Sequence, residues 1–410
     1  MKKVELLSPA GDMEKLKTVY HYGADAAYIG GKILNLRAFS KNFDNFEIET
    51  AVKLAHDLDK KIFVTLNAFP NNYELELLPD YIQYLESLKV DSIIVSDLGV
   101  FNLVKQYSDI PITISTQANN MNWASVKMWK ELGAKRVILA RELSLREINE
   151  IRQKVTDIEL EVFIHGAMCI SISGRCLLSN YLTARDANRG ECTQPCRWKY
   201  YLMEEKRPGE YFQVFEDERG SYIMNSKDLC TIEFLDKIIE TGVDSLKIEG
   251  RMKSSYYAGI TTKIYREAID SYFEGTYSED KIKEWKNELK NVSHRPYTSG
   301  FYLDKTNYNS QNYETSSYIR KYNYVGIVKE KISENSYLIE VKNKIKRGET
   351  IEIIRSKGEK ISILLSEIIN YENNDIIEEA NPNQKIILEV GSSIQSGDLI
   401  RSLKTNATAN

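Results

Sequence analysis

Short apolar runs alternate with amphipathic helical patterns over the first two-thirds of this 410-residue chain. Eight runs have the length and composition of strands, at residues 4–7, 26–29, 62–66, 92–95, 112–115, 136–139, 160–164 and 245–248. Glycines such as Gly23, Gly133 and Gly242 precede several of them, at points where a helix can end in a left-handed conformation. Repeated strand–helix units with short connections predict an α/β fold with a parallel sheet, and eight units predict a closed (β/α)8 TIM-like barrel. A doubly wound open sheet is the alternative.

The pattern breaks after the seventh strand. Residues 167–225 form a cysteine-rich insertion in which segments 200–204, 212–216 and 222–225 predict a small antiparallel sheet, and a helix over 229–239 follows. A helix over 256–272 closes the barrel, which we expect to occupy residues 1–275, and a polar connector covers 276–318. Residues 319–404 show short alternating strands with glycine turns, including one at 361–369, and predict a small all-β barrel.

Four of the five cysteines fall in one short stretch: Cys169, Cys176, Cys192 and Cys196, with the spacing C-x6-C-x15-C-x3-C. In a cytosolic protein, such a group is more often a metal site than a disulfide framework. Four thiolates suit a 4Fe–4S cluster, which we favour; a structural zinc ion, or no metal, is the alternative. Cys230, at the start of the predicted helix 229–239, could replace Cys196 as a ligand, although a small buried residue is the simpler interpretation.

His165 lies at the end of the seventh predicted strand and should point to the catalytic face of the barrel. It is a candidate acid, base or substrate contact, and a packing histidine beneath the cysteine loop is the alternative. His165 and Cys169 could also form the base and nucleophile of a cysteine peptidase. We favour the ligand role for Cys169, because the set of four cysteines is better explained as ligands and no third residue to orient the histidine is apparent.

Polar side chains follow several predicted strands directly and should meet in the barrel mouth, where barrel enzymes keep their active sites. They are Asn67, Asp97, Gln117, Arg141, Glu142, Glu249 and Arg251, with Lys253 close behind. Arginine side chains hold carboxylates and phosphates well, so Arg141 and Arg251 are candidate anion contacts. We predict catalytic roles for four residues, His165, Arg141, Arg251 and Glu249. We predict substrate contacts for four more, Asn67, Gln117, Glu142 and Lys253. An ion pair that closes the barrel rim is the alternative for each charged residue. Gly30 and Gly31 could let the backbone approach a ligand.

The formal net charge of −4 gives no global attraction to nucleic acid, so any RNA binding requires a local basic patch. Basic residues alternate with aromatic ones at 197–201 and 318–322, a pattern that can stack bases and hold phosphates.

No apolar run approaches the ~20 residues needed to span a bilayer. With the odd number of cysteines and no visible signal peptide, we expect a cytoplasmic protein without a membrane partner.

Six segments resemble the collagenase-like peptidase U32 family, and the resemblance extends over nearly the whole chain. They read LSPAG at 7–11, EVFIHGAMC at 161–169, SGRC at 173–176, NRGECTQPCR at 188–197, NSKDLC at 225–230 and KIEGRMK at 247–253. The C-terminal strands resemble the second domain of translation elongation factors, a likeness that would suit contact with RNA.

The resemblance is greatest to the tRNA-hydroxylating branch of that family. It implies an iron–sulfur enzyme that depends on prephenate and converts the wobble uridine of tRNA to 5-hydroxyuridine, with tRNA and this small carboxylate as partners. Collagenase-like proteolysis, hydroxylation of a ribosomal RNA cytidine or a quinone precursor, and an RNA-binding accessory role are the alternatives. The oligomeric state stays open.

Overall fold

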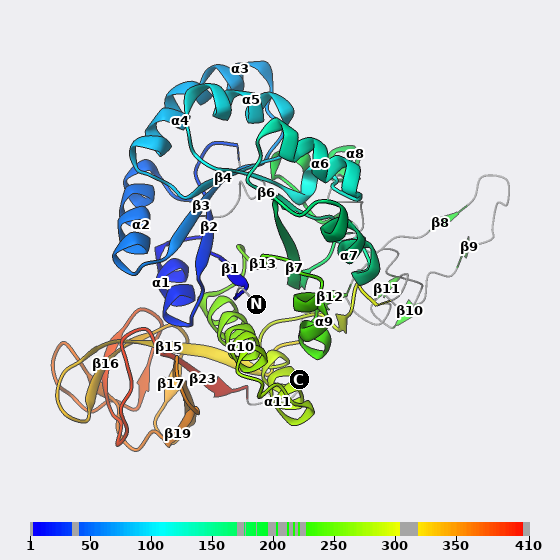
Figure 1. Cartoon of the computed structure of the whole chain (residues 1–410). Coiled ribbons are helices and arrows are strands. Elements are labelled where there is room, and N and C mark those ends of the chain that lie inside the picture. The colour runs from blue at the N-terminus through cyan, green and yellow to red at the C-terminus, as the bar shows by residue number, and fades with distance from the viewer. Residues whose placement is uncertain are drawn as a thin grey trace.

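The computed structural model describes residues 3–34, 41–169, 176, 178–185, 187–195, 227–303 and 319–404, and four two-residue strands between 202 and 221. Eight parallel strands close into a barrel (Figure 1). They are β1 (Glu5–Pro9), β2 (Ala26–Gly30), β3 (Lys61–Leu66), β4 (Ser92–Val95), β5 (Ile112–Ile114), β6 (Arg136–Ile138), β7 (Glu159–Ala167) and β13 (Ser245–Ile248). Because β13 pairs with both β1 and β7, the ring is complete and the predicted barrel is confirmed.

Helices surround this ring (Figure 1). They are α1 (Met13–His21), α2 (Asn45–Asp57), α3 (Asn72–Glu76), α4 (Leu78–Ser87), α5 (Leu98–Tyr107), α6 (Trp123–Leu132), α7 (Leu145–Lys154), α9 (Leu235–Glu240), α10 (Ser255–Phe273) and α11 (Glu279–Leu289). Local sequence fixes several ends: Asp44 and Ser144 begin α2 and α7 with reciprocal capping boxes, and Gly133 ends α6 with a φ of 99°. Strands such as β2 are buried along their whole length, which explains why they read as continuous apolar runs.

Two further strands extend the barrel sheet beyond β7. β12 (Asp228–Cys230) pairs antiparallel with the end of β7, and β14 (Tyr297–Thr298) pairs with β12. The predicted helix over 229–239 was therefore wrong at its start, since the chain continues from β12 into the short helix η5 (Ile232–Phe234) and then α9. The cause is a tertiary pairing with β7, which no local pattern reveals.

The described parts of the cysteine-rich insertion contain α8 (Leu178–Thr183), η3 (Ala187–Arg189) and two antiparallel pairs. β8 (Leu202–Met203) pairs with β9 (Tyr211–Phe212), and β10 (Glu216–Asp217) pairs with β11 (Gly220–Ser221). These pairs confirm an antiparallel insertion, while the predicted segment 222–225 lies outside the described residues.

The C-terminal part is a separate antiparallel structure with its own apolar core. Its seven-stranded sheet has the order β19-β18-β23-β15-β16-β22-β20, and no pairing within the described residues joins its two edges. The predicted small all-β structure is therefore confirmed, in the form of a half-barrel. The strands are β15 (Tyr322–Lys331), β16 (Ser336–Val341), β18 (Thr350–Ile354), β19 (Ile361–Leu364), β20 (Ile369–Asn370), β22 (Lys385–Glu389) and β23 (Leu399–Leu403), with β17 (Ile345–Lys346) and β21 (Glu379–Ala380) paired separately. The predicted strand over 361–369 is thus two strands.

The half-barrel packs beside α1 and α10 (Figure 1). Tyr22, directly after α1, donates a hydrogen bond to the carbonyl of Ile354 (2.5 Å) and accepts one from the amide of Leu399 (2.9 Å). Arg401, fully buried, donates to the Tyr256 hydroxyl (2.8 Å).

The predicted domain boundaries at 275 and 318 stay predictions. None of the described helices is long and apolar enough to cross a membrane.

Candidate active-site cavity

A cavity of about 780 Å³ lies where the carboxyl ends of the barrel strands meet. Seven of the residues predicted for the barrel mouth line it: Asn67, Gln117, Arg141, Glu142, Glu249, Arg251 and Lys253. Asp97 differs, because its carboxylate accepts hydrogen bonds from the amides of Gly99 and Val100 and caps α5. The placement agrees with the rule that barrel sites form at this face, while the individual roles of these residues stay predictions.

Arg141 joins three strand ends across the cavity. One guanidinium nitrogen donates to the carbonyl of Ala167 (2.7 Å), and another donates to the carboxylate of Glu249 (3.2 Å). Its guanidinium also lies 3.8 Å from the ring centroid of Phe163. The ion pair with Glu249 is the alternative that the sequence left open for these two residues. Through the bond to Ala167, Arg141 also fixes the chain shortly before Cys169.

Arg251 is 3% exposed and donates to the hydroxyl of Thr65 (3.1 Å). A Cβ at Gly30 would lie 2.0 Å from a guanidinium nitrogen of Arg251, and one at Gly31 would lie 2.2 Å from the hydroxyl of Tyr81. These two glycines therefore make room for side chains of the protein itself, whereas the sequence suggested room for a ligand.

Lys247 at the cavity wall was missed by the sequence reasoning. It is 4% exposed, its ammonium lies 3.0 Å from a carboxylate oxygen of Glu161, and the Tyr28 ring centroid is 4.5 Å away. Burial lowers the pKa of Lys247 below its usual value, and the adjacent Glu161 carboxylate opposes that shift. The signal was available, because a lysine interrupts the apolar eighth strand.

The cavity is electropositive. Among its described lining residues, five cationic side chains accompany two carboxylates: Arg141, Lys247, Arg251, Lys253 and Arg320 against Glu142 and Glu249. Arg320 comes from the C-terminal part of the chain, as do the lining residues Tyr322, Asn323, Tyr324 and Asn343. This excess of positive charge favours anionic ligands such as carboxylates and phosphates.

The structure corrects the predicted orientation of His165. The residue is 1% exposed and is not among the cavity-lining residues, and its ring packs against Tyr257, Tyr265 and Tyr297. The register between β7 and β13 shifts here, because Lys247 pairs with Phe163 whereas Ile248 pairs with His165. This irregularity turns His165 to the outside of the barrel.

Burial lowers the pKa of His165 to about 3, so the ring is neutral at pH 7. Its predicted catalytic role gains no support from this position.

Three of the four predicted ligands, Cys169, Cys176 and Cys192, line the cavity. The amide of Leu178 donates to the sulfur of Cys176 and that of Gln194 donates to the sulfur of Cys192, both at 3.4 Å. Hydrogen bonds of this kind stabilise a thiolate and occur around cysteine ligands of metal clusters.

Cys196 lies outside the described residues, and Cys230 differs from the other cysteines in position. Cys230 is buried on β12 rather than at the start of a helix, it lines a second hollow, and burial raises the pKa of its thiol to about 11. Within the described ranges, no group of three or more histidine, cysteine or acidic side chains is arranged to hold a metal ion. The donor chemistry of the three cavity cysteines suits an iron–sulfur cluster, and the bound cluster stays a prediction.

Comparison with known proteins gives full-length matches. The family model described as peptidase family U32 matches residues 11–312, and that of the U32 C-terminal domain matches residues 320–401.

Three curated relatives are informative. The chain is 38% identical to tRNA hydroxylation protein P1 of Bacillus subtilis, over 98% of this chain and 96% of the relative. It is 39% identical to tRNA hydroxylation protein P of Escherichia coli, over 87% of each chain. It is also 32% identical to a collagenase of Porphyromonas gingivalis, over 73% of each chain.

Proposed function

The chain belongs to the U32 peptidase family, and from that premise we propose that it is an enzyme that hydroxylates RNA. The observation that carries the proposal is the electropositive barrel-mouth cavity, where three cysteines lie beside Arg141 and Arg251. The nearly full-length similarity to two proteins named for tRNA hydroxylation supports RNA as the substrate. The finer proposal is 5-hydroxylation of the wobble uridine in tRNA.

We further propose that a 4Fe–4S cluster and prephenate take part. Cys169, Cys176, Cys192 and Cys196 would hold the cluster, with Cys230 as the alternative fourth ligand, and the bound cluster would supply a redox centre at the cavity. Arg141, Lys247 and Arg251 would hold the carboxylates of prephenate or a phosphate of the RNA by charge-assisted hydrogen bonds. The excess of cationic lining residues favours such anionic ligands.

Iron and acid-labile sulfide in anaerobically purified protein test the cluster without any assay of activity. We expect both in wild-type protein and a loss of most iron in Cys176→Ser. Comparing Cys196→Ser with Cys230→Ser then identifies the fourth ligand. Stoichiometric zinc without sulfide would overturn the cluster proposal and leave the RNA proposal standing.

Nucleoside mass spectrometry tests the function itself. Transfer RNA from a strain that lacks the gene should contain no 5-hydroxyuridine derivatives, and a plasmid copy should restore them. An unchanged tRNA profile with a lost ribosomal hydroxycytidine would redirect the proposal to ribosomal RNA. If neither RNA changes, the RNA proposal fails.

Peptide cleavage is the second candidate, favoured by the similarity to the collagenase of Porphyromonas gingivalis. The structure does not assemble the pair that this activity needs, because His165 is buried outside the cavity that Cys169 lines. We therefore expect metal-free protein to leave denatured collagen intact. Cleavage that Cys169→Ala abolishes would instead establish the peptidase.

A further inference from the structure

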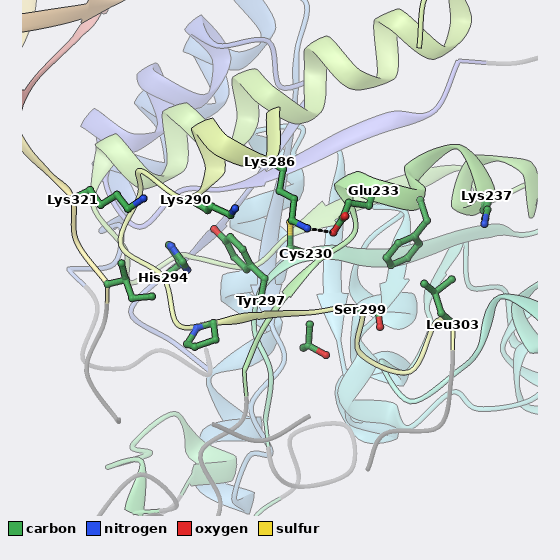
Figure 2. Close-up of a pocket in the computed structure, with 14 residues that line it drawn as sticks. Cys230, Glu233, Lys237, Lys286, Lys290, His294, Tyr297, Ser299, Leu303 and Lys321 are labelled. Atoms are coloured by element: carbon green, nitrogen blue, oxygen red, sulfur yellow. Dashed lines mark ion pairs between the residues drawn. The ribbon is translucent and has the colours of Figure 1, made fainter. Parts of the chain in front are cut away.

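A second hollow, of about 680 Å³, lies beside the barrel between β12, α9 and α11 (Figure 2). Four lysines from different segments line it: Lys237 on α9, Lys286 on α11, Lys290 directly after α11, and Lys321 directly before β15. In the view of Figure 2 they follow one another from Lys321 through Lys290 and Lys286 to Lys237. We call this site the lysine hollow.

The positive charge of the lysine hollow is largely uncompensated. Glu233 is the one carboxylate among its described lining residues, and it pairs with Lys286 at 2.6 Å. Within the part of the chain that the structure describes, Lys237, Lys290 and Lys321 form no ion pair. In a protein with a net charge of −4, such a local excess of cations indicates an anion-binding surface.

The lysine hollow and the active-site cavity share a thin wall. His294 and Ile319 exchange backbone hydrogen bonds, with N···O distances of 2.8 and 3.3 Å, and their segments form this wall. On one side, Ser293 and Arg320 line the active-site cavity, and on the other His294, Ile319 and Lys321 line the lysine hollow. Adjacent residues Arg320 and Lys321 therefore present cations to the two sites, so positive charge continues from one site to the other.

We propose that the lysine hollow binds backbone phosphates of the same RNA whose nucleotide enters the active-site cavity. The proposal rests on the proposed RNA hydroxylation and adds the path of the strand, which crosses the wall at 293–294 and 319–320. Lysine ammonium groups hold phosphates as point charges and read no base, so the contribution is independent of sequence. The target nucleotide is selected in the cavity, and the lysine hollow supplies affinity for the longer RNA.

Paired lysine variants test this path. We expect Lys290→Ala combined with Lys321→Ala to weaken binding of unmodified tRNA roughly tenfold. The slope of log K against log salt should fall by about 1.4, since each lost single-strand phosphate contact contributes about 0.7. Lys127→Ala combined with Lys283→Ala is the matched control, because both lysines are exposed and lie outside both hollows. Each forms its ion pair with a neighbour on its own helix, Lys127 with Glu131 and Lys283 with Asp280. Unfolding midpoints confirm that both double variants are folded.

The length of the RNA separates this inference from the proposed function. A trinucleotide centred on the target uridine should bind the wild type and the Lys290/Lys321 variant equally, because it does not reach the lysine hollow. If wild-type protein hydroxylates tRNA but both double variants bind tRNA with the same affinity and salt slope, the lysine hollow is not part of the RNA site. If wild-type protein neither binds nor modifies RNA, the proposed function and this inference fail together.

Discussion

At the scale of single residues, the protein keeps charged side chains in its interior by pairing them closely. Asp228 and Arg295 are each 1% exposed, and two guanidinium nitrogens lie 2.7 and 3.0 Å from one carboxylate oxygen. Arg295→Ala should lower the free energy of unfolding by about 3–5 kcal/mol, because Asp228 would stay buried without its cation. Urea unfolding measures the loss, and Lys283→Ala in an exposed pair should cost no more than about 0.5 kcal/mol. Similar costs for the two variants would contradict this account.

His165 gives a residue-scale prediction about pH. Burial lowers its pKa to about 3 in the folded protein, whereas the unfolded chain takes up the proton near pH 6.5. Between these values the unfolded state binds more protons, so the stability from this residue is complete above pH 6.5 and declines as the pH falls toward 3. We expect a loss of about 2 kcal/mol from pH 7 to pH 5. Urea midpoints of His165→Leu should show a correspondingly smaller pH dependence, and an unchanged dependence would assign the effect to other groups.

The sequence predicts a polar residue of the site only where the residue directly follows a barrel strand, because the order of the strands then determines where its side chain lies. Asn67, Gln117 and Arg141 follow strands whose ends must meet in a closed barrel, and they do line one cavity. The orientation of His165 depends on a one-residue register shift against β13, which the sequence of β7 does not reveal. Arg320 and its neighbours reach the cavity through packing of the C-terminal part on the barrel, a contact between residues far apart in sequence.

At the scale of elements, α10 packs closely against α1 and the half-barrel through Gly259. A Cβ there would lie 2.7 Å from Leu399, 2.9 Å from Thr18 and 3.0 Å from Tyr22. Alanine usually stabilises a helix by up to about 1 kcal/mol relative to glycine. Here we expect Gly259→Ala to destabilise by about 1–3 kcal/mol, because the added methyl overpacks the contact. Thermal unfolding gives the sign directly, and a higher midpoint for the variant would show that the elements can separate to accept the methyl.

The elements themselves differ in how well the sequence predicts them. The barrel strands are short apolar runs between amphipathic helices, and each was predicted to within a few residues. β12 and β14 have three and two residues, contain no periodic pattern, and exist only because β7 extends beyond the barrel to pair with β12. The half-barrel strands were predicted from their alternation and glycine turns, whereas the order in which they pair depends on contacts that alternation does not report.

At the scale of the whole molecule, the C-terminal half-barrel helps to form both hollows, so its attachment to the barrel should matter for function. Tyr22 bonds to two backbone groups of the half-barrel, at Ile354 and Leu399. Tyr22→Phe leaves both groups without this partner in a buried position and should cost about 1–3 kcal/mol. Limited proteolysis should then release the C-terminal part sooner than in wild-type protein. Identical digestion patterns would show that other contacts alone hold the two parts together.

We propose that RNA hydroxylation takes place at the cysteine-lined cavity of the barrel. The most direct measurement is mass spectrometry of tRNA nucleosides from a deletion strain that carries wild-type protein, Cys176→Ser or the surface control Lys283→Ala, each at equal abundance. We expect 5-hydroxyuridine derivatives to return with wild-type protein and with the control, and to stay absent with Cys176→Ser. Full restoration by Cys176→Ser would contradict it.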